Sequence, residues 1–185
     1  MGEQQVPRVQ TAIAPAELYT TMFGAWTGLI GSAPQRCSLL VLLAHWSHET
    51  SGGHACWNWT LGNAKHVQGD GRDFFVLHCN EFRPDGTEYF VDAQFRAFHG
   101  LAEGVNDYLV LMRGRFGYAW PFVEAGEVED FCHALKQRGY YTAPEQEYAA
   151  GVLRNYRQMD LVIPEDPQPV AAMGPEFVPP EVDNS

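Results

Sequence analysis

One stretch of the sequence decides the fold: Leu39-Leu-Val-Leu-Leu-Ala-His-Trp-Ser-His-Glu49, followed at once by Thr50-Ser-Gly-Gly53. The apolar residues predict a buried helix, and the glycine pair predicts that this helix ends at the acid. An apolar wall and a helix C-terminus both disfavour an ionised carboxylate, so the pKa of Glu49 should rise toward the range that a general acid needs near neutral pH. Glu49 is therefore the first candidate catalytic residue, with a solvated helix-end glutamate as the simpler alternative.

A second helix is predicted before this stretch. Pro15 opens it, and apolar residues recur at helical spacing until Gly31 ends it. Pro34 then begins the helix that leads to Glu49. Two helices thus precede any strand in the chain.

A β-hairpin is predicted next. Residues 74–82 and 88–98 are rich in aromatic and β-branched side chains, and they flank the turn signal Arg83-Pro-Asp-Gly-Thr87. Further helices are predicted over residues 101–112, 118–125, 128–138 and 144–159, the third closed by Gly139 and the last opened by a Thr142-x-x-Glu145 capping box. Helices before and after a single hairpin predict an α+β domain.

Size and charge restrict the possible functions. The chain has 185 residues, of which 45% are hydrophobic and 13% aromatic, which suits one domain with tails. Its formal net charge of -11 opposes binding to nucleic acid or to anionic lipid. The first residues lack the basic and apolar regions of a signal peptide, and the longest apolar run is too short to span a bilayer. We expect a soluble protein that is made in the cytoplasm without a signal peptide, binds no nucleic acid and does not insert into a membrane.

Composition also divides the chain. From Leu161 onward the sequence is acidic and rich in proline, with no Lys or Arg. We predict an N-terminal extension over residues 1–11, a catalytic domain over 12–160 and an acidic, Pro-rich tail over 161–185.

Four stretches, in this order, resemble the glucosaminidases of glycoside hydrolase family 73, in the lysozyme-like superfamily. They are the helix end Ala44-His-Trp-Ser-His-Glu49-Thr-Ser-Gly-Gly53; the loop Asn58-Trp-Thr-Leu-Gly-Asn-Ala-Lys65; the hairpin residues Glu81, Gly86, Phe95 and Arg96; and Ala134-Leu135 with Gly139-Tyr-Tyr-Thr142 and Tyr148-Ala149. The resemblance implies a mostly helical lobe, with a small β-hairpin lobe flanking the cleft. It also implies a peptidoglycan hydrolase that cuts β-1,4 bonds between N-acetylglucosamine and N-acetylmuramic acid, of the endo-β-N-acetylglucosaminidase or muramidase type, without metal or cofactor.

Two carboxylates fit this chemistry. Hydrolysis of a glycosidic bond needs a protonated acid at the leaving oxygen and, usually, a second carboxylate that activates water or stabilises the transition state. The resemblance assigns the first role to Glu49 and the second to Glu81. Glu88 is the alternative second carboxylate, beyond the Gly86 turn.

Aromatic and amide side chains near the acid are candidates for binding sugar. Trp57, Trp59 and Tyr140 could stack on the apolar faces of sugars, and Asn58 and Asn63 could bond to their hydroxyls. For any single aromatic residue a place in the core is the simpler interpretation, but the tryptophans are clustered in a polar loop directly after the acid.

Other functional classes remain open. A metal-dependent amidase could use His45, His48 and Glu49, with His54 and Cys56 close behind. The order His-x-x-His-Glu matches no zinc-protease motif.

The cysteines allow a further alternative. A cysteine amidase could use Cys37, near the start of its helix, although that residue lies in an apolar stretch. Cys37, Cys56, Cys79 and Cys132 form no Cys-x-x-Cys pair, so buried thiols are expected, and an oxidising compartment would allow three pairings. A glycan-binding module without activity is the last class.

We expect a monomer that acts in the periplasm or cell wall on peptidoglycan glycan strands. The resemblance extends to small antibacterial toxins delivered into a competitor's periplasm by type VI secretion, which are paired with an immunity protein that occludes the cleft. The alternative is a phage or prophage lysin of the same chemistry.

Overall fold

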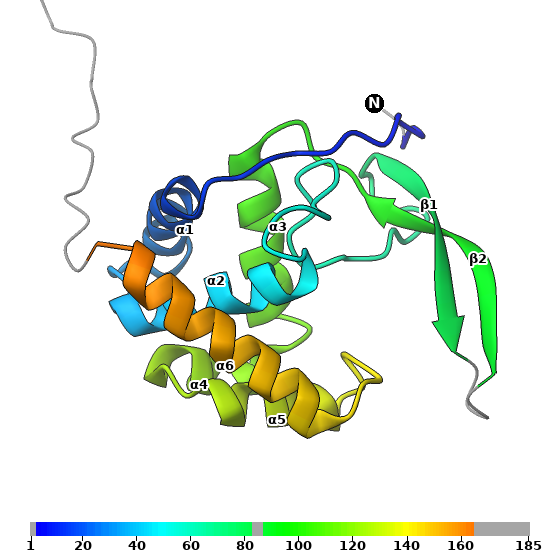
Figure 1. Cartoon of the computed structure of the whole chain (residues 1–185). Coiled ribbons are helices and arrows are strands. Elements are labelled where there is room, and N and C mark those ends of the chain that lie inside the picture. Colours follow the sequence, from blue (N-terminus) through cyan, green and yellow to red (C-terminus); the bar gives the residue numbers. More distant parts are fainter. Residues whose placement is uncertain (1–2, 83–86, 165–185) are drawn as a thin grey trace, which may run out of the picture.

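The computed structural model describes residues 3–82 and 87–164, without the side chains of Glu81 and Phe82. Figure 1 shows a helical body from which one β-hairpin projects. The elements are α1 (Pro15–Ile30), α2 (Arg36–Glu49), β1 (Phe74–Phe82), β2 (Glu88–Arg96), α3 (Leu101–Arg113), the 3-10 helix η1 (Gly117–Ala119), α4 (Trp120–Ala125), α5 (Val128–Gln137) and α6 (Glu145–Val162). The predicted α+β class is confirmed.

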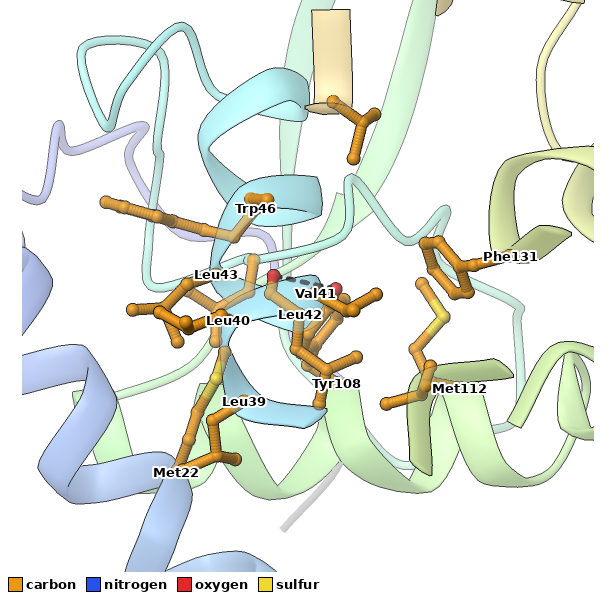
Figure 2. Close-up of a cluster of buried hydrophobic side chains, with 14 of the residues drawn as sticks. Met22, Leu39, Leu40, Val41, Leu42, Leu43, Trp46, Tyr108, Met112 and Phe131 are labelled. Atoms are coloured by element: carbon orange, nitrogen blue, oxygen red, sulfur yellow. Dashed lines mark hydrogen bonds between the residues drawn. The ribbon is translucent and has the colours of Figure 1, made fainter. Parts of the chain in front are cut away.

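Helix α2 is the centre of the helical body. Every residue from Ser38 to Ser47 is buried, so the helix is covered on all sides rather than along one stripe. Met22 of α1, Tyr108 and Met112 of α3, and Phe131 of α5 surround it in Figure 2. Burying one leucine side chain contributes about 1.5 to 3 kcal/mol, so this run fixes the position of the helix and of Glu49 at its end.

Helix α6 lies close against α2. A β-carbon on Gly151 of α6 would collide with the His48 ring, so only glycine permits this approach. Arg36 at the start of α2 forms an ion pair with Asp160 and donates to the carbonyl oxygen of Ile163 at 2.7 Å. These contacts hold the first turn of α6, with Tyr148, opposite the end of α2.

Strands β1 and β2 pair antiparallel, with Phe74 opposite Arg96 and Phe82 opposite Glu88. Phe75 and Phe95 lie directly opposite each other, with ring centroids 5.7 Å apart, in a small apolar cluster separate from the helical core. The centre of the predicted turn, residues 83–86, lies outside the described residues. The hairpin thus has its own small core and projects beyond the helices (Figure 1).

Residues 3–13 bind the hairpin to the helical body. The amide of Val6 donates to the carbonyl oxygen of Phe74 at 2.8 Å, and the amide of Phe74 donates to that of Gln4 at 3.0 Å. Farther along, the amide of Thr11 donates to the carbonyl oxygen of Cys56 at 3.0 Å. The predicted N-terminal extension is therefore extended but not detached, and we call residues 3–13 the N-terminal strap.

Most predicted elements are confirmed, with three corrections. Helix α6 starts after Pro144, which makes no side-chain cap, so the predicted Thr142-x-x-Glu145 capping box is wrong; Glu145 instead lies 2.8 Å from His133 Nδ1. The helix predicted over 118–125 is divided into η1 and α4. Helix α6 runs to Val162 and Ile163 is buried, so the helical body passes the predicted boundary at residue 160, and the rest of the predicted tail from 165 lies outside the described residues.

Two further observations concern membranes and thiols. In the described part of the chain, no helix combines the length and the hydropathy needed to cross a membrane. All four cysteines are free, and Cys56 and Cys132 are buried.

Candidate active site

Glu49 is the last residue of α2, and its side chain is 16% exposed. Tyr148 of α6 donates from its hydroxyl to Glu49 Oε1 at 2.6 Å. Asn63 donates from its amide to the Glu49 carbonyl oxygen at 3.0 Å and lies 3.4 Å from Oε2. The carboxyl group is thus held from two sides while part of it stays open to solvent.

Aromatic rings form the floor below the acid. We call His45, Tyr108, Phe131, Tyr140 and Tyr148 the aromatic floor; the His45 ring lies at the centre, with centroids 5.1 to 6.5 Å from the other four. Burial raises the pKa of the three tyrosines well above their usual range, so their hydroxyls keep their protons. The floor therefore offers neutral donors and no positive charge beneath Glu49.

The environment of Glu49 favours its protonated form. Burial raises its pKa, and the hydrogen bonds from Tyr148 and Asn63 oppose this only in part. The negative end of the α2 dipole, at whose last residue Glu49 stands, acts in the same direction as burial. The raised pKa that the sequence predicts is confirmed in direction, with burial as its cause; the contribution of the helix C-terminus stays a prediction.

The loop after the acid has an unusual backbone. Ser51, Asn58, Trp59 and Asn63 have positive φ angles of 46° to 58°, and in the described part of the chain no other residue except glycine does. Such conformations cost free energy and concentrate at functional sites. Together with Gly52 and Gly53, they turn the chain back so that Asn63 meets the end of α2.

Asn58 has a structural role rather than the predicted contact with sugar. Its Oδ1 accepts from the amide of Val9 at 3.0 Å, and its Nδ2 donates to the carbonyl oxygen of Pro7 at 3.0 Å. Both polar ends of the buried side chain are therefore used by the N-terminal strap. We correct the prediction that Asn58 binds substrate.

The predicted aromatic platforms are half-buried and lie in different places. Trp57 packs on the hairpin cluster and has the Arg8 guanidinium 4.5 Å above its ring. Trp59 packs on the helical core, while Tyr140 belongs to the aromatic floor and donates to the carbonyl oxygen of Gly62 at 3.2 Å. Of the predicted site residues, Asn63 and Tyr140 are the ones brought next to Glu49 and its aromatic floor.

The second carboxylate belongs to the hairpin. Glu81 is in register with Tyr89 near the end of β1, and its side chain lies outside the described part of the structure. Glu88 begins β2, in register with Phe82, and is exposed. The assignment of Glu81 or Glu88 as the second carboxylate stays a prediction.

A network of charges joins the hairpin to α3. Arg96 at the end of β2 lies 3.0 Å from both carboxylate oxygens of the buried Asp107 and 3.3 Å from Asp70. Arg72 lies 3.1 Å from Asp107 and 3.4 Å from Asp70. Two arginines and two aspartates balance in charge, and they anchor the base of the hairpin to α3.

The alternative sites find less support. Among the described residues, the side chains close enough together to hold a metal ion are Glu3, His66 and Asp70, not the predicted group around Glu49. The carboxylates of that cluster are already engaged by backbone amides and, at Asp70, by two arginines. The Sγ atom of Cys37 lies 3.5 Å from Gln35 Oε1. A structural role for this thiol is the simpler interpretation than a catalytic role in a cysteine amidase.

Sequence reasoning missed two residues of the site. Tyr148 belongs to a stretch that carries the resemblance, yet only the structure places its hydroxyl on Glu49. Tyr108 follows Asp107 on an amphipathic helix and was indistinguishable from a core residue; its hydroxyl lies 2.6 Å from His45 Nδ1.

Solved structures share this fold. No protein-family model and no curated protein matches the sequence. The structure resembles the glycoside hydrolase domain of FlgJ from Salmonella typhimurium, with TM-score 0.52, 16% identity and coverage of 80% of this chain and 99% of that one. It also resembles a peptidoglycan hydrolase mutant from Sphingomonas sp. A1, with TM-score 0.58, 21% identity and coverage of 80% and 99%.

A third similar structure is the catalytic domain of the autolysin Auto from Listeria monocytogenes, with TM-score 0.56, 12% identity and coverage of 83% of this chain and 89% of that one. At these identities the likeness shows the fold alone. The fold is lysozyme-like, as the resemblance in the sequence implied.

Proposed function

We propose that this protein is a peptidoglycan glycoside hydrolase that cleaves β-1,4 bonds between N-acetylglucosamine and N-acetylmuramic acid. One observation carries the proposal: a glutamate with a raised pKa ends the central helix, between a tyrosine hydroxyl and an asparagine amide. A general acid must carry its proton when the glycosidic bond breaks, and a raised pKa favours the protonated form of the carboxyl group. The similar solved structures, which are a glycoside hydrolase domain, a peptidoglycan hydrolase and an autolysin, support the same chemistry.

Glu49 acts as the general acid. As the bond between the anomeric carbon and the bridging oxygen breaks, the proton of Glu49 passes to that oxygen, which leaves as a hydroxyl group. The bonding electrons leave with the oxygen, and the sugar takes the character of an oxocarbenium ion. The Tyr148 hydroxyl, 2.6 Å from Oε1, stabilises the Glu49 carboxylate that forms.

A second carboxylate completes the reaction. We assign this role to Glu81, with Glu88 as the alternative, because the hairpin borders the cleft in a lysozyme-like fold. The carboxylate either activates a water molecule that attacks the anomeric carbon or stabilises the positive charge on the sugar. The hydroxyl of that water ends on the anomeric carbon as a new reducing end, and its remaining proton passes to a carboxylate of the site, from which Glu49 is protonated again.

We assign substrate contacts to amide and aromatic side chains of the helical body and the hairpin base. Asn63 is exposed beside Glu49, so its amide can also bond to a sugar hydroxyl. Trp59 and Tyr140, both half-buried, offer ring surface on the helical side, and Trp57 offers it beside the hairpin.

Digestion of purified peptidoglycan tests this function. Wild type should release fragments with new reducing ends, which borohydride reduction and mass spectrometry identify, and these ends assign the bond that is cut. Glu49→Gln should lose at least about a hundredfold in rate, since a general acid contributes about 10² to 10⁴-fold. Release of stem peptides, or activity that a chelator removes and Glu49→Gln keeps, would instead indicate an amidase.

We further propose that the protein is an antibacterial toxin that acts in the periplasm of a target cell and is neutralised by an immunity protein in the cleft. The resemblance of the sequence to small antibacterial toxins of the same chemistry supports this role. A phage or prophage lysin is the alternative.

Expression in the periplasm of a bacterium tests the toxin role. Wild type should lyse the cells, Glu49→Gln should not, and co-expression of the product of an adjacent gene should protect them. Growth without lysis, despite cleavage of purified peptidoglycan, would reject the toxin role while leaving the chemistry intact.

A further inference from the structure

His45 lies directly beneath the acid and has no role in the proton transfer described above. It precedes Glu49 by one helical turn on α2, and its side chain is 0% exposed. Its Nε2 atom lies 3.7 Å from Glu49 Oε1 and is buried without a hydrogen-bond partner among the described residues. A buried polar atom without a partner costs free energy, so a functional reason for its position is expected.

The other ring nitrogen decides where His45 carries its hydrogen. The Tyr108 hydroxyl lies 2.6 Å from His45 Nδ1. It also lies 3.4 Å from the carbonyl oxygen of Leu42, a contact drawn as a dashed line in Figure 2. In the 2.6 Å hydrogen bond the hydroxyl either donates to Nδ1, or accepts from an Nδ1–H while it donates to the Leu42 carbonyl oxygen. Burial, together with the neighbouring His48, lowers the pKa of His45 to about 3, so the ring is neutral. When the hydroxyl donates to Nδ1, the single hydrogen of the neutral ring is on Nε2 and faces Glu49 Oε1 at 3.7 Å, and this is the tautomer that our inference requires.

The two oxygens of Glu49 consequently have different surroundings. Oε1 accepts from the Tyr148 hydroxyl at 2.6 Å and faces His45 Nε2, whereas Oε2 faces the Asn63 amide at 3.4 Å. Donors gathered at one oxygen favour negative charge on that oxygen. The acid proton therefore belongs on Oε2.

We infer that His45 is a positioning residue whose Nε2–H, aligned by Tyr108, keeps the transferable proton of Glu49 on Oε2 and stabilises the carboxylate that remains after transfer. The inference rests on the proposed role of Glu49 as general acid. The separation of 3.7 Å shortens as charge develops on Oε1, because catalytic hydrogen bonds tighten in the transition state.

Other titratable groups surround this pair on every packed element. Tyr108 of α3, Tyr140 after α5 and Tyr148 of α6 stay neutral, because burial raises the pKa of each. His48 on α2 has its pKa lowered by burial and by the charge of Arg154 on α6. Asn63 does not titrate. A shift in the alkaline limb of the pH profile can therefore be assigned to Glu49.

Two substitutions of His45 test the roles of its two ring nitrogens separately. The amide nitrogen of a glutamine reaches the place of Nε2, whereas that of an asparagine reaches only the place of Nδ1. His45→Gln keeps a donor toward Glu49, and His45→Asn keeps a partner for Tyr108 but leaves Glu49 without the donor. His133→Gln on the exposed face of α5 is the matched control.

His45→Asn should lower kcat on peptidoglycan by about 10- to 100-fold, since a hydrogen bond to a charged group is being removed. The alkaline limb of its kcat profile should move to higher pH, because the ionised form of Glu49 is less stable without the donor. His45→Gln should keep about a third or more of the wild-type kcat, because it retains a donor toward Glu49. The alkaline limb of its kcat profile should lie at the wild-type pH. The inference would be overturned if His45→Asn kept the wild-type kcat and alkaline limb. It would also be overturned if both variants lost kcat equally while their alkaline limbs stayed at the wild-type pH.

NMR provides a test that needs neither activity nor a stable variant. The ¹⁵N shifts of His45 in the wild type should identify the Nε2–H tautomer, and the Nδ1–H tautomer would overturn the inference. The ¹³C titration of Glu49 should move to higher pH in His45→Asn and, to a smaller extent, in Tyr108→Phe, which keeps the aromatic packing. If the wild type cuts no glycan, the proposed function fails, whereas the titration still decides whether His45 supports Glu49.

Discussion

The hydroxyl of Tyr148 should control both the rate and the pH range of the enzyme. It donates to Glu49 Oε1 at 2.6 Å. The ring is held independently of this bond, by a stack on Tyr141 with centroids 3.6 Å apart and by the edge of His48 at 4.5 Å. Tyr148→Phe therefore removes one hydrogen bond and leaves the packing in place.

The size of the effect follows from the charge on the acceptor. A hydrogen bond to a charged group is worth about 1.5 to 3 kcal/mol, and each 1.4 kcal/mol corresponds to about tenfold in rate. The bond strengthens as Glu49 becomes a carboxylate, so its loss should lower kcat by about 10- to 100-fold. Because the hydroxyl stabilises the ionised form, its loss raises the pKa of Glu49 further, and the alkaline limb of kcat should move up by about one pH unit.

The assay is the release of reducing ends from peptidoglycan as a function of pH. Tyr141→Phe is the control, because the Tyr141 hydroxyl donates to the Cys132 carbonyl oxygen at 3.0 Å and not to Glu49; its alkaline limb should match that of the wild type. If Tyr148→Phe melts at the wild-type temperature and keeps both the wild-type kcat and the wild-type limb, the reasoning about this hydrogen bond is wrong.

Three further predictions concern stability. Burial raises the pKa of Glu49 in the folded protein above the usual pKa of 4.5, so folding stability is lost as the pH rises from 4.5 through the pKa of the folded state. Glu49→Gln removes this charge and should raise the melting temperature at neutral pH by about 2 to 4 °C. The gain should disappear below pH 4.5, where the carboxyl group is protonated in both states. A β-carbon at Gly104 on α3 would collide with the Trp59 carbonyl oxygen, so Gly104→Ala should lower the free energy of unfolding in urea by about 1 to 3 kcal/mol. The control is Gly24 on α1, where a β-carbon would meet open space. Gly24→Ala should raise the free energy of unfolding by about 0.5 to 1 kcal/mol. Asp107→Asn leaves a guanidinium of β2 poorly paired and should lower the free energy of unfolding by about 3 kcal/mol, measured in the same way.

The elements that local sequence patterns encode could be predicted. The apolar run up to Glu49, the helix from Pro15 to its left-handed cap at Gly31, and the hairpin all depend on residues close together in the chain. The capping box at Thr142 was wrong because a pattern of two residues cannot show that Glu145 faces His133 of another helix.

The site was only partly predictable, because its second half comes from distant segments. Asn63 was identified from its loop, and the structure confirms that it lies beside Glu49. The contact between Tyr148 and Glu49 spans 99 positions, and it depends on the close approach that Gly151 allows between α2 and α6. Asn58 looks like a ligand in the sequence, since nothing there reveals that the N-terminal strap uses both ends of its side chain.

The central claim is that Glu49 donates a proton to the leaving oxygen. Aryl glycosides of glycan fragments ending in N-acetylglucosamine or in N-acetylmuramic acid test it directly, because an acidic phenol leaves as its anion and needs no proton. We predict that Glu49→Gln loses about a hundredfold or more on natural glycan but cleaves the cognate dinitrophenyl glycoside at a rate close to that of the wild type. An equal loss on both substrates would contradict the role of Glu49 as general acid.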